Sequence, residues 1–320
     1  MSNLMTSILH PEKKKHFYPY IVFFVLALVL VQGFFSKGYI LTLDMIFAPD
    51  TFRITNSFYG FENIYSIFPL YAVLDFLGFF IQAEVIQKLL FFLIFFVSGI
   101  SAYRMCPAEW GIGRYFAGFL YMLNPFIYVR FLAGHWLILL AYAVVPFAVK
   151  GFMDFFEAPS TRKSIYIAFL LTFVFTLETH TPFLLFIVLG IFFILNLIES
   201  RKALEISKYT ASIFLFLLFL NSYWLVPSFM GNTAPLAEIT GSDLYTFTTK
   251  QDLNFNTLFT AASMYGFWRG GYIYAKDLLP YWYLFFILIL FLSVHGFVSG
   301  YRHSVHVRAF GIIAVFSVLL

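Results

Sequence analysis

Long stretches of apolar residues recur along the chain and are separated by short polar connections. Ile21–Val31 and Ile213–Leu220, for example, contain no charged residue. A helix needs about 20 mainly apolar residues to cross a bilayer, whereas the strands of a membrane barrel alternate apolar and polar positions. We therefore predict an all-α, polytopic transmembrane helix bundle of eight or nine helices, near 17–35, 86–103, 114–130, 136–153, 165–180, 182–198, 209–227 and 279–298, with the ninth starting near Arg308.

Two of the predicted connections are long. Ser36–Val85 contains an apolar part, Ile67–Ile81, that is interrupted by polar and helix-breaking residues and is expected to lie in the interface or to re-enter the membrane. Ser228–Leu278 is rich in Thr, Asn, Gly and Tyr and is expected to be an ordered polar outer loop. Without an internal repeat or a flexible linker, residues 1–320 form one membrane domain. Its ninth apolar run stops at Leu320, so we expect the sequence to be truncated at its C-terminus.

The composition agrees with a lipid-facing surface. Apolar residues make up 61% of the chain and charged residues only 11%, against about 25% in soluble domains. The net charge of +4 is small and spread over many loops, which argues against a nucleic-acid-binding patch. The single cysteine, Cys106, excludes an internal disulfide framework and a cysteine-based metal site.

The basic residues predict the orientation in the membrane. Lys13–Lys15 precede an apolar run that is too long for a signal peptide and lacks a small-residue cleavage site, so we interpret it as an uncleaved first helix. With a cytoplasmic N-terminus, every cytoplasmic loop carries a Lys or Arg, and basic residues favour that side about two to one. The chain is therefore expected to be a multi-pass cell-membrane protein. Acidic residues gather on the outer side, which indicates a functional outer surface.

Asp44 is the first candidate for chemistry. It lies in an otherwise apolar stretch a few residues beyond the outer membrane edge. A carboxylate there is suited to act as a general base towards an acceptor hydroxyl, and a helix cap or a solvated loop acid is the alternative. Asp50 follows Pro49, which suits a turn, and is a further candidate for substrate binding.

The segment from Leu123 to Trp136 is the second candidate. Asn124 is a natural cap before Pro125, which should kink or restart a helix, and Gly134 permits a hairpin turn. Arg130 and His135 then lie at the outer membrane edge. A guanidinium there suits a phosphate group, although snorkelling to lipid headgroups explains it equally well.

Glu178 and His180 give the sharpest signal, because they are close together in a chain with few charges. They join two predicted helices with almost no loop, and Thr181 before Pro182 is a good helix start. Ionisable groups at membrane depth are usually functional, and a helix N-terminus attracts anions. The alternative is a structural pair that closes a tight helical hairpin.

Other candidate sites are weaker. Asp44, His135, Glu178 and His180 offer oxygen and nitrogen ligands for a divalent metal, but their spacing matches no known motif, so no metal ligand is assigned and the cofactor stays open. Trp268 and Arg269, in the late outer loop, are candidates for sugar binding, and interfacial anchoring is the favoured interpretation. The sequence contains no Walker loop, dinucleotide fingerprint or nucleophile elbow.

These features occur in an order that resembles the GT-C type of membrane glycosyltransferases, and the stretch from Asn124 to Trp136 also resembles YfhO-like membrane proteins. The resemblance implies transfer of a sugar from a polyprenyl-phosphate donor to an acceptor outside the cytoplasm. It implies that Asp44 is the base and that Arg130, with a helix N-terminus, holds the donor phosphate. It also implies that Glu178 and His180 orient donor or acceptor.

Two other classes of protein remain as alternatives. One is a transporter or lipid flippase, and the other is a non-catalytic membrane subunit. Transporters place ionisable groups near the bilayer midplane and use broken helices. Here the charged residues avoid the middle of the predicted spans and collect at the outer edge, which favours chemistry at the interface.

Overall fold

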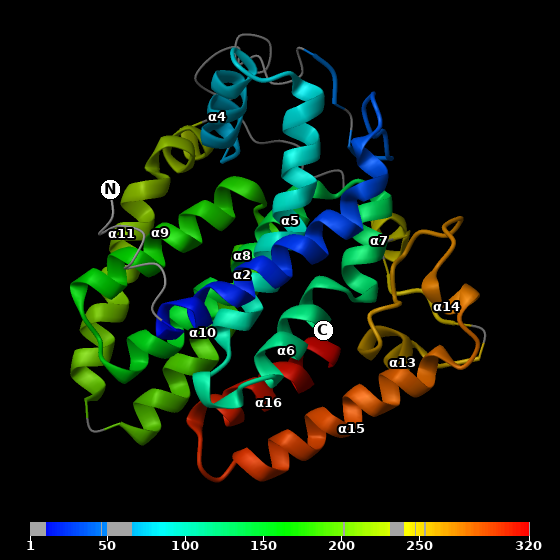
Figure 1. Ribbon diagram of the computed structural model, residues 1–320. Coiled ribbons are helices and arrows are strands. Elements are labelled where there is room, and N and C mark those ends of the chain that lie inside the picture. Colours follow the sequence, from blue (N-terminus) through cyan, green and yellow to red (C-terminus); the bar gives the residue numbers. More distant parts are fainter. Residues whose placement is uncertain are drawn as a thin grey trace.

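The computed structural model describes residues 11–45, 47–49, 66–200, 202–230, 240–246, 248–252 and 254–319, without the side chains of 11–16, 243 and 244. These residues form helices and no strand (Figure 1). The order of helices is α2 (Pro11–Val31), η1 (Gln32–Phe35), α4 (Phe68–Gly78), α5 (Ala83–Met105), η3 (Ala108–Trp110), α6 (Gly113–Met122), α7 (Pro125–Ala133), α8 (Trp136–Glu157), α9 (Thr161–Leu177), α10 (His180–Glu199), α11 (Ala203–Met230), α12 (Gly241–Thr246), α13 (Thr257–Ala262), α14 (Ala275–Leu278), α15 (Trp282–Gly300) and α16 (Val305–Leu319).

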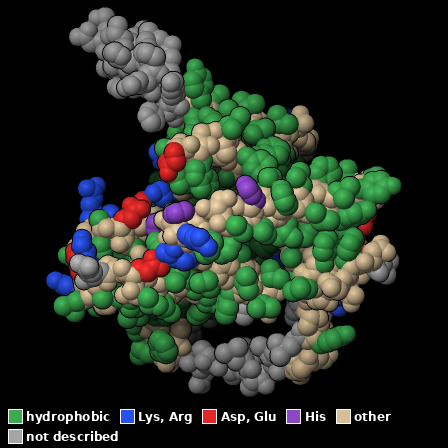
Figure 2. Space-filling view, turned by 90° about the horizontal axis from the view of Figure 1, so that it is seen from below, with side chains coloured by type: hydrophobic (Ala, Val, Ile, Leu, Met, Phe, Trp, Pro, Cys, Tyr) green, Lys and Arg blue, Asp and Glu red, His purple; other side chains and the backbone are tan. Residues whose placement is uncertain are grey.

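Among the described residues, seven helical segments are long and apolar enough to cross a membrane. The face shown in Figure 2 is mostly hydrophobic, and its charged side chains gather towards one side. Such a surface would be unstable in water and suits contact with lipid. The structure therefore supports a multi-pass membrane protein with these candidate spans: Phe17–Phe35, Ala83–Met105, Gly113–Ala133, Trp136–Glu157, His180–Glu199, Ala203–Met230 and Trp282–Gly300.

The predicted helix 114–130 is two helices in the structure, α6 and α7, with a break at Leu123 and Asn124. The Asn124 side chain accepts a hydrogen bond from the Ile127 amide at 3.1 Å, and Pro125 occupies the first helical turn. The predictions for these two residues are confirmed. The break starts α7, which carries Arg130 of the candidate site.

Close packing of α2, α5 and α6 depends on two glycines. A Cβ atom on Gly99 would lie 2.4 Å from the Phe23 ring, and one on Gly118 would lie 2.6 Å from the Gly99 carbonyl oxygen. Small residues let helix backbones approach closely in membranes, where helix association depends on van der Waals packing. One buried cluster forms around this crossing, and a second joins α8, α9, α10 and α11.

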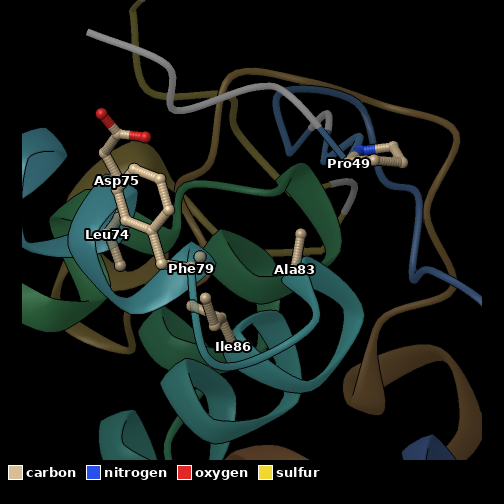
Figure 3. A pocket seen from close by; sticks show the side chains of 7 residues that line it. Pro49, Leu74, Asp75, Phe79, Ala83 and Ile86 are labelled. Atoms are coloured by element: carbon tan, nitrogen blue, oxygen red, sulfur yellow. The ribbon is translucent and has the colours of Figure 1, made fainter.

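The predicted interfacial segment 67–81 contains α4, which packs on α5 and α9. Pro49, Asp75 and Phe79 line a small cavity beside it, together with residues at the start of α5 (Figure 3). Its volume is about 50 Å³, which is room for one or two water molecules. This cavity is therefore too small for an organic substrate.

Helix α15 lies apart from the other long helices (Figure 1). None of its residues is buried, and its contacts include α14, α16 and the Phe259 ring of α13. The following helix, α16, returns to the bundle and packs against α10. An apolar helix with this exposure is compatible with contact with lipid on most of its surface.

Candidate functional site

The loop that follows η1 packs directly on the turn between α7 and α8. The Asp44 amide donates a hydrogen bond to the Ala133 carbonyl at 3.0 Å. Gly134 ends α7 with φ of 80°, a left-handed conformation that favours glycine. A Cβ atom there would lie 2.4 Å from Thr42 Oγ1 and 2.5 Å from the Met45 amide nitrogen. Gly134 therefore makes the turn, as predicted, and also makes room for the loop that carries Asp44.

Asp44, His135 and Arg130 form a continuous chain of hydrogen bonds. Arg130 Nη1 lies 3.0 Å from His135 Nδ1, and His135 Nε2 lies 2.8 Å from Asp44 Oδ2. A guanidinium can only donate, so Nδ1 must accept and Nε2 must carry the proton. His135 is thus a neutral imidazole that donates to the Asp44 carboxylate and links it to a cation.

Burial lowers the pKa of His135, and the charge of Arg130 lowers it further, while the hydrogen bond to Asp44 raises it less. The imidazole is therefore neutral at pH 7, which agrees with its hydrogen-bonding pattern. The Asp44 side chain is 53% exposed and that of His135 is 16% exposed. The carboxylate is the part of this chain of groups that an incoming molecule meets first.

Two phenylalanine rings flank the Arg130 guanidinium. Its central carbon lies 5.4 Å from the centre of the Phe126 ring and 4.8 Å from the centre of the Phe267 ring, both within the range of a cation–π contact. The Nε atom is buried without an acceptor among the described residues. Nη1 donates to His135, whereas the Nε–H group is an unused donor among the described residues.

Phe267 was not recognised from the sequence as part of this site. It is buried in a small cluster with Val129 and Ala133 of α7, and its ring centre lies 6.0 Å from that of His135. The loop between α13 and α14 that carries it is also tied to α7, because the Tyr128 hydroxyl donates to the Ile273 carbonyl at 2.7 Å. This loop therefore covers the side of the site that Arg130 occupies.

Glu178 caps α10, which begins at His180. Glu178 Oε1 accepts from the His180 amide at 2.8 Å, and Oε2 accepts from the Thr181 amide at 2.6 Å and its hydroxyl at 2.7 Å. The prediction that Thr181 before Pro182 starts the helix is wrong, because the helix begins two residues earlier, at His180, and the longer Glu178 side chain reaches its free amides. Glu178 thus closes the α9–α10 hairpin.

Burial is the largest single influence on Glu178 and raises its pKa, but the hydrogen bonds from His180 and Thr181 together outweigh it, so the net pKa is lowered. Glu178 is therefore a carboxylate at pH 7. It lies within range of a Coulombic attraction to Arg130. The His180 ring is 90% exposed and contacts Glu178, and the electrostatic influence of this pair on Arg130 comes from Glu178.

The structure thus brings Asp44, His135 and Arg130 into direct contact, with Glu178 close enough to act electrostatically. Trp268 and Arg269 belong to the covering loop. Trp268 packs on the cluster of Val129, Ala133 and Phe267, and the Arg269 guanidinium lies over the Trp268 ring at 6.0 Å. Asp50 lies outside the described residues.

Among the residues that the structure describes, no group of three or more His, Cys, Asp and Glu side chains is placed to hold a metal ion. His135 uses both ring nitrogens in hydrogen bonds, to Arg130 and Asp44. Neither nitrogen is free to bind a cation without breaking this chain of contacts. The geometry therefore fits acid–base or anion-binding chemistry.

A comparison of the chain with protein-family models, with curated proteins and with solved structures finds no match in any of the three.

Proposed function

We propose that this protein is a membrane glycosyltransferase of the GT-C type, built from eight or nine spanning helices, that transfers a sugar from a polyprenyl-phosphate donor to an acceptor outside the cytoplasm. The observation that carries the proposal is the chain of hydrogen bonds from Arg130 through His135 to the half-exposed carboxylate of Asp44. A carboxylate that can accept a proton and a cation that can bind phosphate lie on either side of one imidazole, and this arrangement supports the proposed transfer.

In this reaction Asp44 accepts the proton of the acceptor hydroxyl while that oxygen attacks the anomeric carbon of the sugar. The bond between this carbon and the phosphate oxygen breaks, and the lipid phosphate leaves with the bonding electrons. Arg130 stabilises the charge that develops on the phosphate. His135 holds the Asp44 carboxylate in place, and Glu178 keeps the Arg130 side chain oriented by electrostatic attraction.

A binding assay tests the role of Arg130. Purified protein in detergent is titrated with a short-chain polyprenyl phosphate, and Arg130→Ala is compared with Lys250→Ala, which removes an exposed cation of the outer loop. We expect Arg130→Ala to weaken binding and Lys250→Ala to leave it unchanged. Arg130→Lys should also weaken binding, because the forked donor geometry is lost. Equal binding by all four proteins would remove Arg130 from the site.

A transfer assay tests the role of Asp44. Sugar release from a polyprenyl-phosphate-linked donor is measured with and without candidate acceptors, and Asp44→Asn should abolish it while leaving binding of the donor intact. Asn keeps the size and one oxygen acceptor of Asp but cannot accept the proton. Transfer at the wild-type rate by Asp44→Asn would exclude Asp44 as the base.

The proposal includes a cytoplasmic N-terminus, which the basic residues support. Single cysteines are placed at Ala158, Ala203 and Ser242 in a variant that lacks Cys106, and intact cells are labelled from outside. We expect labelling at Ser242 alone. Strong labelling at Ala203 would invert the topology and place the Asp44 site on the cytoplasmic side.

A further inference from the structure

An apolar cavity lies on the other side of α7 from Arg130. Its volume is about 480 Å³, which falls in the range of about 300–1,000 Å³ that is usual for small-molecule sites. α2, α5 and α6 contribute to its wall, and its lining includes Phe95, Ile127, Phe131 and Leu132. Ile127 and Phe131 are four positions apart and so share a helix face. The cavity is wide enough for a hydrocarbon chain and offers water few partners.

A second cavity, of about 470 Å³, lies in the late outer loop. Its wall includes Phe255, Trp282 and Tyr283, whose rings contact one another at centre distances of 5.6–6.4 Å. Tyr281, beside them, has a φ of 60°, a left-handed conformation that costs a non-glycine residue free energy. The strained turn thus brings three consecutive aromatic residues to one cavity.

Tyr265 lies between the two cavities. It lines the apolar cavity together with Ala275, and its ring packs on Trp282 of the aromatic cavity at 4.7 Å between centres. Lys276, the residue after Ala275, lines the aromatic cavity. The Tyr265 hydroxyl has no hydrogen-bond partner among the described residues. Because Tyr265 borders both cavities, a molecule with an apolar and a polar part can lie across its ring, with one part in each cavity.

The charged residues around the aromatic cavity indicate which kind of polar group it can bind. Of the described residues that line it, Lys276 alone is charged, and this ammonium is paired with Asp252. A second carboxylate, Asp277, lies close enough to Tyr265 to raise the pKa of its hydroxyl, although burial is the larger cause. Two carboxylates against one ammonium disfavour an anionic head, whereas the Asn254 amide and the aromatic rings suit hydroxyl groups and sugar faces.

We propose that this pair of cavities binds one neutral glycolipid, with a hydrocarbon chain in the apolar cavity and an uncharged sugar in the aromatic cavity. The site is separate from the Asp44 site, and its ligand differs from a polyprenyl phosphate because it carries no charge. Contact with the bilayer, where such lipids occur, agrees with the exposed apolar helices of the fold.

Native mass spectrometry tests the proposal. The protein is purified in an uncharged detergent without sugar and titrated with hexadecyl maltoside or with a lysophosphatidylglycerol of the same chain length. We expect one tightly bound maltoside and weaker binding of the anionic lipid. Leu132→Trp fills the apolar cavity and should weaken maltoside binding about tenfold, which corresponds to about 1.4 kcal/mol. Leu288→Trp, on the exposed surface of α15, is the matched control and should bind like wild type.

Further variants separate the two parts of the site. Asn254→Ala removes an exposed amide whose side chain makes no hydrogen bond within the described chain, so it should weaken maltoside binding without affecting the anionic lipid. Ala275→Phe narrows the apolar cavity from the loop and replaces Leu132→Trp if that variant fails to fold. Arg130→Ala should bind maltoside normally. Equal binding by the cavity-filling variants and the control, or a preference for the anionic lipid, would overturn the proposal.

Discussion

Replacing Gly134 by alanine should both destabilise the protein and open the Asp44 site. An alanine in the left-handed conformation costs about 1–2 kcal/mol. The new Cβ atom would also lie 2.5 Å from the Met45 amide nitrogen and 2.9 Å from that of Asp44. Backbone atoms cannot rotate away as a flexible side chain can, so this overpacking should cost about 1–3 kcal/mol more. The loop must move, and the hydrogen bond from Asp44 to Ala133 must lengthen or break.

Gly271→Ala is the matched control for this experiment. Gly271 has a φ of 88°, close to the 80° of Gly134, but no atom of the described residues lies within 4 Å of the position that its Cβ atom would take. Both variants therefore carry a similar backbone strain, and only Gly134→Ala adds the steric conflict. The free energy of unfolding is compared for both in mixed micelles with increasing SDS. A larger loss for Gly134→Ala measures the close approach of the Asp44 loop, and equal losses would refute it.

The same pair of variants reports on the site. Diethyl pyrocarbonate modifies neutral imidazoles, and peptide mapping identifies the modified histidine. In the wild type both His135 ring nitrogens are engaged, with Arg130 and Asp44. We expect faster modification of His135 in Gly134→Ala than in the wild type or in Gly271→Ala. An unchanged rate would show that the Asp44 loop does not hold His135.

Three other changes test the electrostatics and the packing. Burial and a neighbouring guanidinium lower the pKa of His135. Its neutral form therefore stabilises the fold above about pH 6.5, and this contribution is lost as the pH falls through the lower folded-state pKa. The difference in melting temperature between wild type and His135→Gln should shrink on acidification. Gly118→Ala places a Cβ atom 2.6 Å from the Gly99 carbonyl oxygen and should cost about 1–3 kcal/mol, whereas Gly190→Ala, with open space around it, should cost nothing in the same SDS titration. Glu178→Gln turns one of two engaged oxygens into a donor facing a donor and should cost about 1–3 kcal/mol, measured in that titration too; equal stability would contradict the capping role.

The apolar runs predicted most of the long helices, seven of which are long and apolar enough to cross a membrane among the described residues, because a spanning helix must satisfy its backbone internally and shield it with apolar side chains. The predicted ends were less accurate. α9 begins at Thr161, four residues before the predicted start, because the Ser160 side chain accepts from the Lys163 amide and caps it. Lys163 and its neighbours are polar, and hydropathy alone does not show that polar residues continue a helix beyond the membrane.

Local signals also predicted the turn at Gly134 and the cap at Asn124, since both depend on residues that are adjacent in sequence. The contact between Asp44 and His135 joins positions that are 91 residues apart, and no local rule predicts it. Their predicted position at one membrane edge favoured a common site for these residues, but it did not predict which side chains touch. Phe267 was missed for the same reason, because its part in the site depends on how the late outer loop folds back on α7.

The hydrogen bonds that join Arg130, His135 and Asp44 explain why a charged site is stable in so apolar a protein. A lone carboxylate or guanidinium at the membrane edge would lose hydration without compensation. Here the neutral imidazole of His135 accepts from Arg130 and donates to Asp44, so both charges gain a partner and no two charged groups need direct contact. Protonation of His135 would remove the acceptor for Arg130 and set two cations against each other. The site is therefore organised to keep His135 neutral, and its proton stays on the nitrogen that faces Asp44.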